Sequence, residues 1–183
     1  ESTSGSDAAG MRTTATRTAR GWTLNGAKTF ITHGRVGQVM VVMAVTDKAA
    51  GPKGITAFVV EHGTPGMRAG RKEDKLGMRA SDTTEVIFEN CEIPEDRVVG
   101  EVGRGFIDTM QVLDAGRIGI AALSVGLAQG AYEAALHYAR ERKAFGRTIG
   151  SYQGIKHKLA DMYTANQLAR VHCYHGAWAL DCD

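Results

Sequence analysis

Two short stretches carry residue types that bind anions. The segment SGSDAAG, residues 4–10, is a glycine- and serine-rich loop around Ser6, and such a loop can turn its backbone N–H groups toward a phosphate. The segment RKAFG, residues 142–146, contains Arg142, whose guanidinium is a planar fork of donors that matches phosphate geometry. Each also has a simpler interpretation, which is an ordinary turn at Ser6 and a cation that complements a helix C-terminus at Arg142.

A third stretch suits a ring with polar edges. In TFIT, residues 29–32, Phe30 and Thr32 lie on the same face of an expected strand because strand side chains alternate. An apolar wall and a hydroxyl would then face the same ligand. The alternative is that Phe30 belongs to the core and Thr32 to the surface.

Metal-binding signals are weak. His172 and His175 are spaced i, i+3, but no third ligand is evident, so a place on a helix surface is favoured and no metal site is predicted. The three cysteines are odd in number and lack paired metal spacing. They are therefore expected to be free thiols in a reducing compartment.

The first hundred residues have the short Val-rich runs of a β domain. We expect strands at 38–45, 55–61 and 84–94, the first two of them buried, and a tight hairpin turn at Asn25-Gly26. Gly and Asn recur between these runs. The pattern is typical of a compact antiparallel sandwich or barrel.

From Gly105 the apolar period becomes helical. One helix is expected to about residue 143, and after the break FGRTIG a second helix should begin at Ser151 and run to the end of the chain. Four glycines each lower the helix propensity of the first by about 1 kcal/mol relative to Ala: Gly116, Gly119, Gly126 and Gly130. We therefore expect close packing there, as part of a four-helix type of bundle.

The chain is thus predicted to be an α+β protein with a β domain at 1–100 and two long helices at 101–183. Its 183 residues are 43% apolar and 23% charged, which is a globular composition. The net charge of +2 is too small to suggest nucleic acid. We find no signal peptide and expect no apolar run long enough to span a membrane.

Four stretches, in this order, resemble the acyl-CoA dehydrogenase family: SGSDAAG, KTFITHG, KLGMRASDTTEVIFENCEIP and RKAFGRTIGSYQGIKHKLADM. The stretch LDAGRIGIAALSVGLAQGAYEAA is most similar to short-chain and branched short-chain members. The resemblance covers essentially the whole chain. It implies the middle β domain followed by about two helices of the C-terminal domain, with Glu1 where the family's TEP loop runs.

The resemblance implies FAD as the cofactor. Ser6 would face the pyrophosphate or the pantetheine of the substrate. Phe30 would cover one flavin edge, Ile31 would lend its backbone, and Thr32 would hydrogen-bond near flavin N5. Many members have Trp where this chain has Phe30, and Phe keeps the apolar wall but loses the indole N–H.

Three further residues would serve the FAD of a neighbouring subunit. The resemblance implies that Arg142 meets its pyrophosphate, that Phe145 stacks near the adenosine, and that Gln153 hydrogen-bonds it. A homodimer or homotetramer is therefore expected.

The resemblance also implies a set of substrate contacts: Ser6, Asp114, Ala115, Gly116 and Arg117. In isovaleryl and long-chain members a Glu base stands where this chain has Gly116. The catalytic Glu is therefore expected beyond Asp183, in a later segment, and no catalytic residue is assigned in this chain. Asp114 is a poor candidate for the base because its side chain is shorter and faces a different position on the helical turn.

The implied activity is flavin-dependent α,β-dehydrogenation of short or branched short-chain acyl-CoA thioesters, with electron-transfer flavoprotein as acceptor. The expected location is the bacterial cytoplasm or the mitochondrial matrix. The alternatives are an acyl-CoA oxidase or nitroalkane oxidase on the same fold, or a non-catalytic binding module.

Overall fold

The computed structural model describes residues 1–182. They divide into two compact units, Glu1–Met110 and a second from Gln111 onward. The α+β prediction is confirmed, because the first unit holds a sheet and the second holds most of two long helices.

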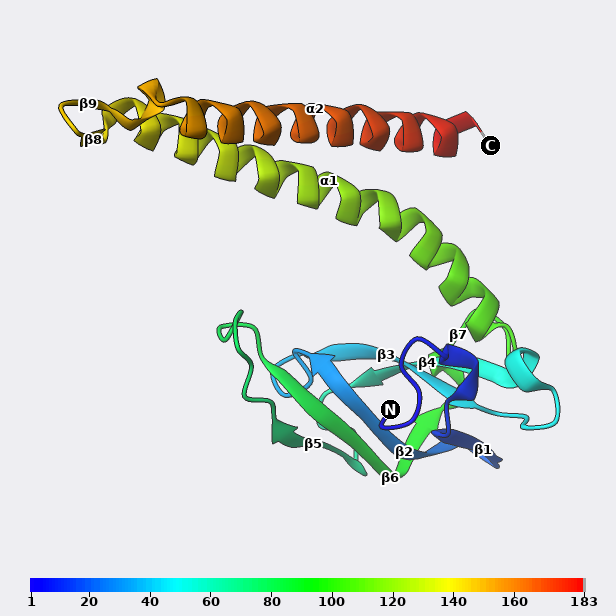
Figure 1. Cartoon of the computed structure of the whole chain (residues 1–183). Coiled ribbons are helices and arrows are strands. Elements are labelled where there is room, and N and C mark those ends of the chain that lie inside the picture. The colour runs from blue at the N-terminus through cyan, green and yellow to red at the C-terminus, as the bar shows by residue number, and fades with distance from the viewer. Residues whose placement is uncertain (183) are drawn as a thin grey trace. The chain divides into compact units, whose positions relative to one another are not determined.

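Seven strands of the first unit form one mixed sheet in the order β5-β6-β2-β1-β3-β4-β7 (Figure 1). The strands are β1 (Thr14–Thr18), β2 (Gly21–Thr32), β3 (Val39–Val45), β4 (Ile55–Glu61), β5 (Met67–Lys72), β6 (Thr83–Pro94) and β7 (Val98–Val99). Short 3₁₀ turns cover Ala8–Gly10, Gly51–Gly54 and Glu95–Arg97. The three strands expected from Val-rich runs are present, and β1, β5 and β7 were missed because they are short or polar.

The sheet differs from the expected antiparallel arrangement at one pair of strands. β1 pairs parallel with β3 through Thr14 and Val45, whereas β1 and β2 are antiparallel. The chain leaves β2 and crosses β1 before it forms β3, so β3 runs in the same direction as β1. Local sequence patterns do not encode this crossing.

The hairpin expected at Asn25-Gly26 is wrong. β2 continues through these residues, and the tight turn lies earlier, between Thr18 and Gly21, which pair as the last residues of β1 and the first of β2. At Asn25 the extra residue of a β-bulge lies on β6, where Asn90 has φ 50° and donates its N–H to Asn25 Oδ1 at 2.8 Å. The Asn-Gly pair therefore supports a bulge instead of a turn.

Buried side chains from the sheet strands form the hydrophobic core of the first unit. Trp22 and Phe58 meet edge to face with ring centroids 5.6 Å apart, and Phe88 is buried beside them in the same cluster. The expectation that β3 is fully buried is wrong, because its side chains alternate: Val42 is buried and Val41 is 63% exposed. A half-buried strand can consist of Val throughout when only one of its faces contacts the core.

Both predicted helices are confirmed, as α1 (Gly105–Glu141) and α2 (Gln153–Cys182). Between them lie a small hairpin, β8 (Lys143–Ala144) with β9 (Arg147–Thr148), and a 3₁₀ turn at Ile149–Ser151. The 3₁₀ turn delays the start of α2 from the expected Ser151.

In the second unit, polar and aromatic contacts join α1 to α2. Asn166 Nδ2 and Arg170 both donate to Gln129 Oε1, at 2.6 and 3.0 Å, and the rings of Tyr132 and Tyr163 lie 5.6 Å apart. Close packing at the α1 glycines is not seen within the described chain, since a Cβ at any of the four would meet nothing within 4 Å. The close approach is at Gly176, whose Cβ would lie 3.0 Å from Ile118 Cδ1.

Many apolar side chains of α1 are exposed in this chain. By length and composition α1 is apolar enough to cross a membrane, which contradicts the expectation that no run has that length. The same exposure is expected of a helix whose apolar surface packs against other helices of a bundle.

We predict that Gly26→Ala lowers the free energy of unfolding of the full-length protein, meaning the complete open reading frame that contains this chain. Gly26 has φ 147°, and an added Cβ would lie 2.8 Å from Thr13 Cα. Residues in such backbone regions cost about 1–3 kcal/mol. Denaturant unfolding measures the change.

Gly77→Ala is the matched control, because its added Cβ meets nothing within 4 Å and its φ is not in the left-handed region. It should be neutral or slightly stabilising. Equal effects of the two substitutions would contradict the assigned conformation at Gly26.

Candidate functional site

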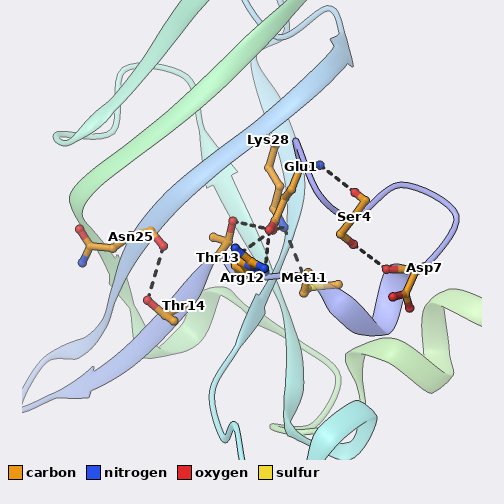
Figure 2. Close-up of polar contacts among 9 residues, drawn as sticks. All are labelled: Glu1, Ser4, Asp7, Met11, Arg12, Thr13, Thr14, Asn25 and Lys28. Atoms are coloured by element: carbon orange, nitrogen blue, oxygen red, sulfur yellow. Dashed lines mark hydrogen bonds and ion pairs between the residues drawn. The ribbon is translucent and has the colours of Figure 1, made fainter.

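The loop that carries Ser6 is closed by the carboxylate of Glu1. Glu1 accepts hydrogen bonds from Arg12 N at 2.6 Å, from Thr13 N at 3.1 Å and from Thr13 Oγ1 at 2.7 Å. Lys28 Nζ on β2 is the fourth donor, at 2.6 Å. Figure 2 shows these donors converging on the Glu1 carboxylate. One side chain thus ties the two ends of the loop together and fastens them to the sheet.

The Glu1–Lys28 pair is largely removed from water. The Glu1 side chain is 8% exposed and that of Lys28 is 15% exposed. Burial by itself raises the pKa of Glu1, but the hydrogen bonds from Lys28, Arg12 and Thr13 outweigh it and lower the pKa to about 2. Glu1 is therefore ionised throughout the physiological pH range.

A buried serine shapes the inside of the loop. Ser4 is 8% exposed, and its hydroxyl donates to the Asp7 carbonyl oxygen at 2.6 Å. Gly10 N donates to the same oxygen at 3.1 Å, which closes the turn before Met11. Gly5 and Ser6 remain exposed on the outside of the loop, where their backbone can face a ligand.

A cavity of about 260 Å³ lies between the loop and the sheet. Gly5 of the loop and Ile31 of β2 both line it, together with the Glu1–Lys28 pair. Most of its remaining walls are aliphatic or aromatic, from Met40, Val42, Met43, Val86 and Phe88. The loop and the TFIT segment therefore meet at one apolar cavity.

The TFIT segment contains a second bulge, which modifies the expected alternation. Lys28 pairs with Val86 and Ile31 pairs with Thr84, so β2 carries one extra residue between them. Phe30 lies within this bulge at φ 57° and is 71% exposed. Thr32 is also exposed, and Ile31 between them packs against the core.

The predicted residues near the helix junction lie around the β8–β9 hairpin. Phe145 has φ 51° and is 96% exposed. Tyr152 supports the hairpin, since its hydroxyl donates to the Ala144 carbonyl oxygen at 2.8 Å and Arg147 lies 4.1 Å over its ring. Arg142, directly after the end of α1, and Gln153, the first residue of α2, flank the hairpin and are exposed. The structure thus brings these three predicted residues into one segment of the second unit.

The predicted substrate contacts lie on the solvent-exposed side of α1. Asp114 and Arg117 form an ion pair of 3.5 Å with both side chains more than 70% exposed. Ala115 and Gly116 between them are also exposed. The last helix carries His175 beside Trp178, with ring centroids 5.7 Å apart. Within residues 1–182 no group of three His, Cys, Asp or Glu side chains gathers.

Sequence reasoning missed three supporting residues. Glu1 was placed in a loop without a role, and Lys28 was not singled out. A lysine just before the TFIT segment of a half-buried strand was the available signal. Tyr152 was missed as well, because its support of the hairpin depends on a contact across the turn.

Comparison with known proteins assigns the family. The model described as acyl-CoA dehydrogenase, middle domain, matches residues 1–91, and the model described as acyl-CoA dehydrogenase, C-terminal domain, matches residues 103–183. The chain belongs to the acyl-CoA dehydrogenase family. The resemblance expected from the four ordered motifs is therefore confirmed.

Individual relatives agree with this family. The mitochondrial isovaleryl-CoA dehydrogenase of Oryza sativa subsp. japonica is 48% identical over 100% of this chain and 44% of its own length. The human mitochondrial short-chain specific acyl-CoA dehydrogenase is 48% identical over 97% of this chain and 43% of its own length. The solved butyryl-CoA dehydrogenase of Megasphaera elsdenii has a TM-score of 0.91 at 44% identity, covering 96% of this chain and 46% of that one. The chain thus spans less than half the length of these relatives.

Acyl-CoA dehydrogenases are FAD-dependent oxidoreductases, and the chain has features that fit a flavin nucleotide. Phe30 and Phe145 are phenylalanines with left-handed backbone and mostly exposed rings. Such backbone costs about 1–3 kcal/mol, and an exposed ring gains little from burial to offset it. A bound aromatic ring would cover each side chain. The exposed Gly5 and Ser6 backbone supplies donors of the kind that phosphates accept.

We predict an acid-induced weakening of the Glu1 network. The folded-state pKa of Glu1, about 2, lies below its ordinary value of 4.5, so the unfolded state binds more protons in between. The stabilisation is complete above pH 4.5 and is lost as the pH falls toward 2. Denaturant unfolding between pH 5 and 2 should show a steeper loss of stability for the native protein than for Glu1→Gln.

The control is Glu89→Gln, which removes the acid from the exposed Arg68–Glu89 ion pair of 2.9 Å. Its stability curve should run parallel to that of the native protein. A Glu1→Gln curve that is also parallel would contradict the lowered pKa of Glu1.

Proposed function

We propose that the full-length protein is an FAD-dependent dehydrogenase that converts short or branched short-chain acyl-CoA thioesters to enoyl-CoA. The observation that carries the proposal is the ordered match of both units to the middle and C-terminal domains of the family. Relatives named for isovaleryl, short-chain and short/branched-chain substrates, at 46–48% identity, support the substrate class.

One part of the flavin site is assigned to residues of the first unit. When bound, FAD supplies the hydride acceptor for the reaction. We propose that Ser6 and its loop bind the pyrophosphate or the pantetheine. Phe30 and Thr32 face the flavin ring and its polar edge, and the Ile31 backbone lies between them. The exposed positions of Phe30 and Thr32 support this assignment.

The β8–β9 hairpin is assigned to the FAD of a second subunit. We propose that Arg142 binds its pyrophosphate, that Phe145 stacks on the adenosine, and that Gln153 donates to it. The exposed ring of Phe145 on a braced hairpin supports such a contact. This arrangement requires a homodimer, or a homotetramer as a pair of dimers.

The acyl-CoA is assigned to α1, at Asp114, Ala115, Gly116 and Arg117, together with Ser6. The α-proton of a thioester is weakly acidic, so a positioned base is needed. We propose that this base is a Glu in a segment later than residue 183, because the helix position used by isovaleryl-type enzymes is Gly116 here.

Membership of the family also suggests an electron acceptor. A solved structure titled for an electron transferring flavoprotein of Acidaminococcus fermentans is 46% identical, with a TM-score of 0.91, and supports such a flavoprotein as the acceptor.

We propose a domain boundary near residue 100 and a location in the bacterial cytoplasm or the mitochondrial matrix. Mitochondrial relatives in plants and human, and bacterial ones such as that of Bacillus subtilis, support either location.

A second candidate is oxidation with oxygen as acceptor. The prolyl acyl carrier protein oxidase AnaB shares the fold, with a TM-score of 0.91 at 32% identity. Turnover of a panel of acyl-CoA thioesters, with an artificial dye and with oxygen as alternative acceptors, separates the two. Dye reduction with butyryl or isovaleryl thioesters and slow oxygen consumption support the dehydrogenase. Equal rates with oxygen would favour the oxidase, and no turnover of any thioester would exclude both.

We predict that Arg142→Ala raises the Kd of the full-length protein for FAD by about tenfold and so lowers its flavin occupancy after purification, because a charge-assisted contact to phosphate is lost. Flavin absorbance relative to protein absorbance measures the occupancy. Arg140→Ala is the control, since Arg140 is an exposed cation on the same helix end. Equal losses in the two variants would point to a general charge effect.

We predict that Gly116→Glu restores part of the turnover to a full-length variant whose own catalytic Glu has been replaced by Gln. A side chain at position 116 has open space, since its Cβ meets nothing within 4 Å. The chain-length preference should change because the base approaches from a different position. Gly119→Glu, equally open, is the control and should restore nothing. Recovery with Gly119→Glu alone would place the pocket about one turn further along α1, because residues three apart share a helix face.

A further inference from the structure

The Glu1 network joins three parts of the site. Glu1 precedes the loop around Ser6, Arg12 and Thr13 follow it, and Lys28 lies on β2. All four donors reach one carboxylate, and they come from residues that lie 11 to 27 positions after Glu1 in the chain. The loop is therefore anchored to the sheet at Lys28.

The same lysine borders the bulge that carries Phe30. Lys28 is the last residue of β2 in register with β6 before the extra residue, and pairing resumes at Ile31. A contact that holds Lys28 thus holds both the loop and the start of the bulge.

Water cannot easily take the place of either partner of the Glu1–Lys28 ion pair. Both side chains are at least 85% buried, and they line an apolar cavity. Removing one partner of such a pair leaves a buried charge without compensation, which is far more disruptive than loss of an exposed pair.

We propose that Glu1 and Lys28 are a positioning pair that sets the distance between the Ser6 loop and the TFIT segment, and thereby the affinity for the cofactor, without either side chain contacting it. The inference rests on the proposed function for the cofactor's identity. The coupling of Lys28 to the loop rests on the structure alone.

The test uses four variants of the full-length protein: Lys28→Met, Glu1→Gln, the double variant, and Arg68→Met as control. Arg68 and Glu89 form an ion pair of 2.9 Å between neighbouring strands of the same sheet, but both side chains are more than half exposed. Two quantities are measured for each, namely the Kd of the apoprotein for FAD by titration and the amide exchange rate of residues 2–11. Thermal unfolding confirms that each variant is folded.

We expect Lys28→Met to raise the Kd for FAD by about tenfold, the lower end of what loss of an orienting partner costs at metal sites. Exchange in residues 2–11 should accelerate by a similar factor, while Arg68→Met leaves both within about twofold. Glu1→Gln should act in the same direction, and it lies outside the sheet, so it remains informative if Lys28→Met does not fold. The double variant should recover part of the loss, because no unpaired charge remains.

Native Kd and native exchange in Lys28→Met and Glu1→Gln would overturn the inference, and so would a double variant whose losses are the sum of the two single ones. If the native protein binds no FAD, the proposed function fails. The exchange rates of the variants then still decide whether the pair positions the loop.

Discussion

The buried ion pair between Glu1 and Lys28 is the interaction on which the candidate site depends. A carboxylate inside an apolar cavity is tolerable only when its oxygens are satisfied, and four donors from three residues satisfy this one. The need to satisfy that charge brings a glycine- and serine-rich loop, flexible by composition, into a defined place above the sheet. The pKa of Glu1 is lowered for the same reason, because the donors that hold the loop also stabilise the ionised carboxylate.

The sheet below the loop is a rigid support that is interrupted by β-bulges. Trp22, Phe58 and Phe88 form a close-packed core, and the pairing of β2 with β6 is regular except at two bulges. One bulge turns Phe30 outward beside the cavity, and a separate hairpin in the second unit does the same with Phe145. Strained, exposed aromatic residues on well-packed supports are a pattern expected where a ligand is bound.

Several features could be predicted from sequence because they depend on local periodicity. The helices α1 and α2 follow from repeated apolar positions, and the break between them follows from FGRTIG. The hairpin expected at Asn25-Gly26 failed for a related reason. Gly26 does adopt a positive φ, as the dipeptide suggests, but its value of 147° is that of a glycine inside a strand beside a bulge and not that of a left-handed hairpin turn. Only the partner strand decides between them.

The sequence by itself determined the family, the division into strand-rich and helix-rich halves, and the types of residue available to a nucleotide and a thioester. These properties are carried by composition, motif order and period, which are local. The tertiary structure alone decided that Glu1 meets Lys28 across 27 residues and that β3 crosses to lie parallel to β1. It also decided that Phe30 lies in a bulge. Each of these depends on strand register and on which charges are buried together, and both are set by packing between segments that are distant in the chain.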